Sequence, residues 1–381
     1  MKAISKCLFA AAALSLATSA FAADNPVWKT VSASDNTVYA IKADGTLWGW
    51  GDNELGELGQ GSVDQKQSST PLQIGTDNDW KAAYGARGCG FFIKENGTLW
   101  TVGSNEKQMS GVGDGVTKHT SLVQVGTDSD WESLGTSITW CFTVMGIKTD
   151  GSLWAWGSGE DFCLGQGDTR NSSVPIRVGI DNDWKQVSIG STHVLALKDD
   201  GSLWGWGFAP YKQLINEQTS VKVPTRISND KWQAVYAINN ASYGVKEDGT
   251  LWAWGDNQEN ILGLNSDMSG LEEGATLPNV DVPTQVTAIS APVTALSGCQ
   301  YVRVVIAGGK VLAWGANANG ALGDGKGESY EVGMNQFSYT PVEVLLPENT
   351  TSVQLSSGQR FSSVLTSEGV LYGWGSTRWG Q

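Results

Sequence analysis

The stretch Asp44-Gly45-Thr46-Leu47-Trp48-Gly49-Trp50-Gly51 recurs in altered form along the whole chain. The further copies begin at Asn96, Asp150, Asp200, Asp248, Gly308 and Glu368. Corresponding leucine or valine positions are 48 to 60 residues apart, a spacing typical of one blade of a β-propeller. Seven copies therefore predict seven blades.

Each copy contains the pattern of a β-hairpin. In the fourth copy an apolar run ends before Asp200-Gly201, and Leu203 then opens a second strand. A tryptophan-opened strand such as that at Trp184 precedes each hairpin, and a proline-opened strand such as that at Pro175 follows it. Four strands per copy predict an all-β fold, a seven-bladed β-propeller of four-stranded antiparallel blades.

The repeat resembles the regulator of chromosome condensation repeat. The resemblance rests on the tryptophan-initiated strand, the hairpin, the Trp-Gly pair and a glycine-rich loop, here at residues 56–61, 163–167 and 320–325. It covers essentially everything after residue 26 and implies the propeller fold, here in a bacterial secreted form. Nuclear members of that family bind chromatin and act as exchange factors for a small GTPase, roles that do not suit an acidic, exported chain.

The first 22 residues have the composition of a secretory signal peptide. Lys2 and Lys6 precede an apolar run, and Ala20-Phe21-Ala22 matches a small-residue cleavage site. We expect the propeller to occupy residues 23–381 and to be periplasmic or extracellular, without membrane insertion after cleavage. An uncleaved membrane anchor is the alternative, although the apolar run is short for a bilayer span.

The chain carries a formal charge of −14, and removal of Lys2 and Lys6 leaves 23 basic residues against 39 acidic ones. Such a surface repels phosphate backbones, so no nucleic-acid partner is expected. Acidic turns such as Asp77-Asn78-Asp79 fall on the same propeller face as the Asp-Gly hairpins. Calcium ligation and ordinary turn chemistry are both open interpretations of these aspartates.

The opposite face has mixed charge and carries the candidate partner-binding residues. Trp140 departs from the repeat, standing in for the loop glycine of Gly190 and Gly298, and is predicted to lie beside the mouth of the central tunnel. The alternative is that it packs over its own loop. The remaining candidates on this face are Arg87, Phe142, Arg303, Arg360 and, in an insertion of the sixth unit, Tyr330, Met334 and Phe337. That insertion can equally be decoration without a partner.

Four cysteines follow the signal segment, and Cys141 and Cys163 form the candidate disulfide because both fall in loops of one unit and one face. Free thiols are the alternative. No metal or cofactor is predicted, because zinc spacing, a Gly-x-Ser-x-Gly elbow and a His-Glu-x-x-His pair do not occur.

These observations favour a non-catalytic, exported binding module that uses one propeller face for a macromolecular partner, most simply a protein. The alternatives are a polysaccharide-active enzyme with an unrecognised carboxylate pair and a glycan-binding surface protein. The last unit stops at Trp379-Gly380-Gln381, midway through its glycine-rich loop. The last blade is therefore expected to be incomplete, or the sequence to be a fragment of a longer product.

Overall fold

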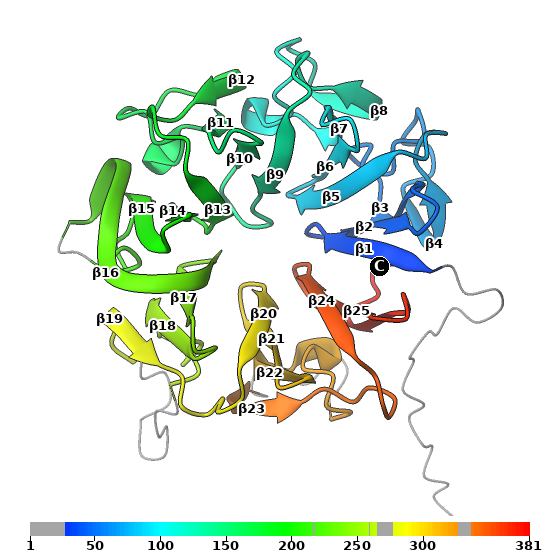
Figure 1. Cartoon of the computed structure of the whole chain (residues 1–381). Coiled ribbons are helices and arrows are strands. Elements are labelled where there is room, and N and C mark those ends of the chain that lie inside the picture. Colours follow the sequence, from blue (N-terminus) through cyan, green and yellow to red (C-terminus); the bar gives the residue numbers. More distant parts are fainter. Residues whose placement is uncertain (1–26, 216–217, 259, 265–276, 327–336) are drawn as a thin grey trace, which may run out of the picture.

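The computed structural model describes residues 27–381 apart from 216–217, 259, 265–276 and 327–336. Its strands form sheets arranged as blades around a central axis, and the chain passes through them in sequence order (Figure 1). Helix in these ranges is limited to single turns of 3-10 type, η1 (Glu106–Gln108), η2 (Glu160–Phe162) and η3 (Ala318–Gly320). No helix among the described residues is long and apolar enough to cross a membrane.

Each blade runs outward from an inner strand through successive antiparallel neighbours. The inner strands are β1 (Trp28–Ala33), β5 (Trp80–Ala86), β9 (Trp131–Gly135), β13 (Trp184–Ile189), the second half of β16 (Ser220–Ile238), β20 (Val293–Gly298) and β24 (Ser352–Ser357). The second strands are β2 (Thr37–Lys42), β6 (Cys89–Lys94), β10 (Thr143–Lys148), β14 (His193–Lys198), β17 (Ala241–Lys246), β21 (Val302–Ala307) and β25 (Phe361–Thr366).

The third strands carry the repeat phrase. They are β3 (Leu47–Asp52), β7 (Leu99–Ser104), β11 (Leu153–Gly157), β15 (Ser202–Phe208), β18 (Leu251–Gly255), β22 (Lys310–Ala316) and β26 (Leu371–Gly375). The fourth strands are β4 (Gln67–Gln73), β8 (Lys118–Gln124), β12 (Ser172–Arg177), the first half of β16, β19 (Val280–Gln285) and β23 (Phe337–Glu343).

Three blades depart from the plan of separate four-stranded sheets. Strand β16 pairs with β15 along its first half and with β17 along its second, so blades 4 and 5 share one seven-stranded sheet. Blade 7 has three strands, because β26 pairs only with β25 within the described ranges. The seven-bladed all-β fold with an incomplete last blade is confirmed.

The Asp-Gly hairpins also join neighbouring blades. Asp44 accepts hydrogen bonds from the backbone N–H and the hydroxyl of Thr46, at 3.0 and 2.6 Å. Gly45 has φ +82°, and a Cβ there would lie 2.0 Å from the carbonyl oxygen of Asn78 in the acidic turn of blade 2. Glycine is therefore required both by the turn and by the next blade. The contact also places hairpins and acidic turns on one face, as predicted.

Tryptophans of the third strands pack between blades. The indole N–H of Trp156 donates to the Met109 carbonyl of the preceding blade at 3.0 Å, and Trp206 donates in the same way to Cys163 at 2.9 Å. Both indoles are fully buried. Because a buried indole needs a hydrogen-bond partner, this contact fixes the register of adjacent blades. The repeated tryptophans of these strands therefore serve to pack one blade against the next.

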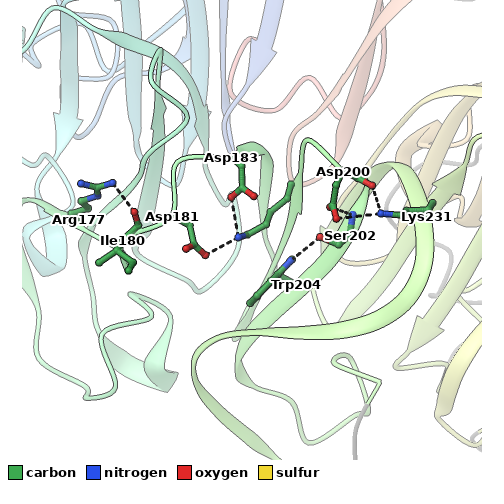
Figure 2. Close-up of polar contacts among 9 residues, drawn as sticks. Arg177, Ile180, Asp181, Asp183, Asp200, Ser202, Trp204 and Lys231 are labelled. Atoms are coloured by element: carbon green, nitrogen blue, oxygen red, sulfur yellow. Dashed lines mark hydrogen bonds and ion pairs between the residues drawn. The ribbon is translucent and has the colours of Figure 1, made fainter.

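The aspartates of the acidic turns bind a lysine at the end of the second strand. The Lys198 ammonium lies 2.7 Å from Asp181 and 2.9 Å from Asp183, and 5.0 and 4.6 Å from the ring centroids of Trp184 and Trp204. Figure 2 shows both aspartates pointing to this ammonium group. Lys94 and Lys148 repeat the arrangement in blades 2 and 3. These carboxylates thus have a cation supplied by the chain itself.

Candidate partner-binding site

The connections between first and second strands meet near the centre of the ring, on the face opposite the acidic turns. They line a pocket of about 310 Å³, counting space open to solvent. Its lining residues come from blades 2, 3, 5, 6 and 7, and are Arg87, Ile138, Thr139, Trp140, Asn239, Cys299, Gln300 and Gln359. The pocket is therefore assembled by the ring as a whole.

Trp140 is the most exposed aromatic side chain of this pocket, with 70% of its surface accessible. The guanidinium of Arg87, from the neighbouring blade, lies 3.9 Å from the centroid of the Trp140 ring and 5.2 Å from that of Phe142. Arg87 makes no side-chain ion pair within the part of the chain that the structure describes. Stacking holds the cation in place while its N–H groups stay available to an incoming acceptor.

Trp140 lies in a lengthened connection of blade 3. Trp131 pairs with Lys148 as Trp184 pairs with Lys198, so counting forward from the first strand puts Ser137 at the position of Gly190. Thr143 pairs with Gly157 as His193 pairs with Gly207, so counting back from the second strand puts Trp140 at that position. The prediction that Trp140 lies beside the central axis is consistent with its place in the pocket.

Hydrogen bonds between loops hold the pocket floor in place. The backbone N–H of Arg87 donates to the Ser137 carbonyl at 3.1 Å, and the Ser137 hydroxyl donates to Gly190 at 3.3 Å. Ser191 continues the chain of contacts by donating to the Asn239 side chain at 2.6 Å. Loops of blades 2 to 5 are thereby joined around the pocket.

The prediction that Arg303 binds a partner is wrong, because its side chain is fully buried. Its guanidinium donates to the Tyr243 hydroxyl at 3.0 Å, to the Val302 carbonyl at 3.1 Å and to the carbonyl of Cys299. It therefore joins blades 5 and 6 from inside and has no surface to offer a partner.

The other candidates lie in different surroundings. Phe142 is only 9% exposed and packs in the core beneath Arg87, so it supports the site and does not present a face of its own. Arg360 is exposed and follows the pocket residue Gln359. Phe337 is half-buried on the outer strand β23, stacked on Tyr339, away from the pocket (Figure 1). Tyr330 and Met334 lie outside the described residues.

Cys141 and Cys163 are brought together as free, buried thiols, each of which shifts the pKa of the other. The structure thus contains the predicted proximity without the predicted bond. Sequence reasoning missed Asn239, Gln300 and Gln359, whose amides line the pocket. A signal for them existed, since each lies in the connection between a first and a second strand, as Trp140 and Arg87 do.

Hydrogen-bonding and aromatic groups make up most of the pocket lining. Its lining offers one cation, three amides, a hydroxyl and one exposed indole, and it holds neither a carboxylate nor a histidine. Burial raises the pKa of the Cys299 thiol, which disfavours the nucleophilic thiolate. No cluster of three or more histidine, cysteine or acidic side chains suited to a metal occurs among the described residues.

Comparison with known proteins identifies the repeat. A family model described as the regulator of chromosome condensation (RCC1) repeat matches residues 44–91, 150–197, 248–305 and 308–365, and a second model of that repeat matches 28–57 and 184–213. The matched residues make up more than half of the chain and fall on the blades.

Relatives occur in plants, and similar folds in yeast and humans. The RCC1 domain-containing mitochondrial protein RUG3 of Arabidopsis thaliana is 29% identical over 67% of this chain, which spans 56% of that protein. The ultraviolet-B receptor UVR8 of the same plant is 25% identical over 91% of this chain and 76% of its own length. This chain thus spans little more than half of RUG3.

Solved structures show the same architecture. Prp20p of Saccharomyces cerevisiae, described with its binding to Gsp1p and histones, superposes with a TM-score of 0.74 at 19% identity, covering 92% of this chain and 83% of Prp20p. Human WBSCR16 gives 0.72 at 19% identity, covering 92% and 87%. With the repeat matches and the seven blades, the chain belongs to the family of proteins built from regulator of chromosome condensation (RCC1) repeats.

Proposed function

We propose that this propeller is an exported, non-catalytic binding protein whose pocket around Trp140 takes a segment of a partner protein. One observation carries the proposal, namely a largely exposed indole held under a cation from the neighbouring blade. Tryptophan and arginine are the residues that most often dominate binding energy at protein interfaces. Export rests on the signal-like residues 1–22.

The chemistry of the pair specifies the partner segment. The free edge of the Arg87 guanidinium fits a carboxylate, and the open face of Trp140 fits an apolar or aromatic side chain. The amides of Asn239 and Gln359 can hydrogen-bond the backbone of an extended peptide. The proposed ligand is therefore a peptide segment with an acidic residue next to an apolar one.

Two solved structures of the same fold are described with protein partners. Prp20p is described as binding the proteins Gsp1p and histones, and yeast RCC1 (Prp20) has been solved with Kap60 bound to it. At under 20% identity these structures establish the fold alone, so their partners are not transferred to this chain.

Selection of displayed random peptides on the folded propeller tests the proposal. Selected peptides should pair Asp or Glu with an apolar residue, and Trp140→Ala should weaken their binding at least about tenfold, as expected for a central interface aromatic. Arg87→Gln should weaken binding and reduce its salt dependence. The matched control is Ile180→Ala, because Ile180 is 88% exposed in the acidic turn of blade 4, on the opposite face.

Two results would contradict the proposal. If the selected peptides bind Trp140→Ala and the unaltered chain equally well, the pocket around Trp140 is not their binding site. Binding restricted to a glycan array, with loss on Trp140→Ala, would show that the indole stacks on sugar and that the partner is a polysaccharide.

A further inference from the structure

Two cysteines lie together directly beneath the Trp140 loop. Cys141 follows Trp140 in sequence, and Cys163 lies in the glycine-rich turn after β11 of the same blade. Their exposed fractions are 5% and 1%, and both belong to one buried cluster. The two side chains are close enough for each thiol to shift the pKa of the other.

Contacts that do not involve sulfur bring the two loops together. The backbone N–H of Ser158 donates to the Phe142 carbonyl at 2.9 Å, and the Thr143 hydroxyl donates to the Ser158 carbonyl at 2.6 Å. The Cys163 carbonyl accepts the indole N–H of Trp206 in the next blade at 2.9 Å. The approach of the thiols is thus a consequence of the fold. Cys89 and Cys299 lie in blades 2 and 6, away from this pair.

The interaction between the two thiols distinguishes the sulfurs. It lowers the pKa of Cys141, and together with burial it raises the pKa of Cys163. Of the two sulfurs, Cys141 therefore loses its proton more readily. A thiol with a lowered pKa beside a second thiol is the arrangement of an oxidation-sensitive pair.

We propose that Cys141 and Cys163 are a modification site, a dithiol that a small peroxide converts into an intramolecular disulfide. The Cys141 thiolate attacks one oxygen of hydrogen peroxide, the O–O bond breaks, and the leaving hydroxide takes a proton to become water. This leaves a sulfenic acid on Cys141. The Cys163 sulfur then displaces the hydroxyl, which leaves with the Cys163 proton as a second water. Two thiols have lost two electrons, and the peroxide has gained them.

The cross-link acts on the proposed binding loop. Cys141 is adjacent to Trp140, so the disulfide ties this loop covalently to the glycine-rich turn. A tied loop has fewer conformations to lose when a partner binds. Oxidation would therefore pre-organise the indole, although the cross-link itself can be tested without any partner.

Peptide mapping after peroxide treatment of the folded, unaltered chain is the first test. We expect a single cross-linked pair, Cys141 with Cys163, lighter by two hydrogens, with Cys89 and Cys299 still alkylated as free thiols. Cys163→Ser should instead leave a sulfenic acid on Cys141 that dimedone traps. The proposal is wrong if both thiols stay free after treatment, or if the cross-link involves Cys89 or Cys299.

Chymotrypsin cleavage after Trp140 is the second test and needs no substitution. Cleavage requires local opening of the loop, so oxidation should slow it about fivefold or more, and reduction with dithiothreitol should restore the rate. Equal rates in a fully oxidised and a fully reduced sample would show that the disulfide does not restrain the Trp140 loop.

Discussion

Replacing Glu57 by glutamine should change how the stability of this propeller depends on pH. Glu57 is 3% exposed, and its carboxylate accepts the backbone N–H of Leu55 at 2.8 Å. In blade 4 Gln213 accepts the equivalent bond from Tyr211 at 2.9 Å. The repeat itself therefore shows that a neutral amide fits this position.

Burial, followed by the charges of Asp52 and Asp35, raises the pKa of Glu57 to about 8. The folded pKa lies above the unfolded value, so this group stabilises the fold below about pH 4.5, and the contribution is lost as the pH rises through about 8. Each unit of pKa shift corresponds to about 1.4 kcal/mol of unfolding free energy. Solvent and local adjustment of the structure reduce the cost of burying the charged carboxylate, so the unfolding free energy should fall by about 2–4 kcal/mol between about pH 5 and about pH 8.5.

Urea unfolding at these two pH values measures the effect. Glu57→Gln should remove the loss, so the variant becomes progressively more stable than the unaltered chain as the pH rises. Any cost of the unpaired amide nitrogen, as at Gln213, is the same at both pH values and cancels. Glu54→Gln is the control, because it removes a negative charge from the same loop at an exposed side chain. Parallel stability profiles for Glu57→Gln and the unaltered chain would refute the reasoning.

Three further predictions concern other buried contacts. Lys198→Met should lower the unfolding free energy by about 2 kcal/mol, because it leaves two aspartates unpaired. Lys231→Met, at an exposed ion pair, should lower it by less than about 0.5 kcal/mol. Equal losses for the two variants in urea titrations would contradict this. Burial lowers the pKa of His193 to about 3, so unfolding free energy should fall by about 1.4 kcal/mol per unit as pH drops from about 6.5 towards 3, and a slope unchanged in His193→Gln would disprove the assignment. Gln354→Ala removes two bonds to the Val31 backbone, at 3.2 and 2.9 Å, that join blades 7 and 1, and should accelerate hydrogen exchange at Val31; unchanged exchange would show that other contacts close the ring.

The fold was predictable because each copy of the repeat contains its own hairpin, turn glycine and packing tryptophan. The candidate site was harder to predict from the sequence, as Arg303 illustrates. Charge alone suggested exposure, but Arg303 pairs with Trp314 as Val194 pairs with Trp206, and that register marks an inward position. Alignment of whole hairpins would have shown the burial.

Trp140 shows the opposite case. Its departure from the repeat made it a candidate, and the structure places it in the pocket, yet its contact with Arg87 joins two blades and depends on the angle between them. The spacing of residues within one repeat does not determine that angle. The amides of the pocket could not be predicted for the same reason, since they come together only when the ring is closed.

The continuous strand β16 gives the ring an uneven mechanical structure. Elsewhere a connecting loop separates one blade from the next, so neighbouring blades can in principle open one at a time, as units in a linear array do. Blades 4 and 5 share unbroken backbone pairing from β13 to β19. These two blades should therefore unfold and refold as one cooperative block, and partial opening of the ring should begin at the joints outside that block.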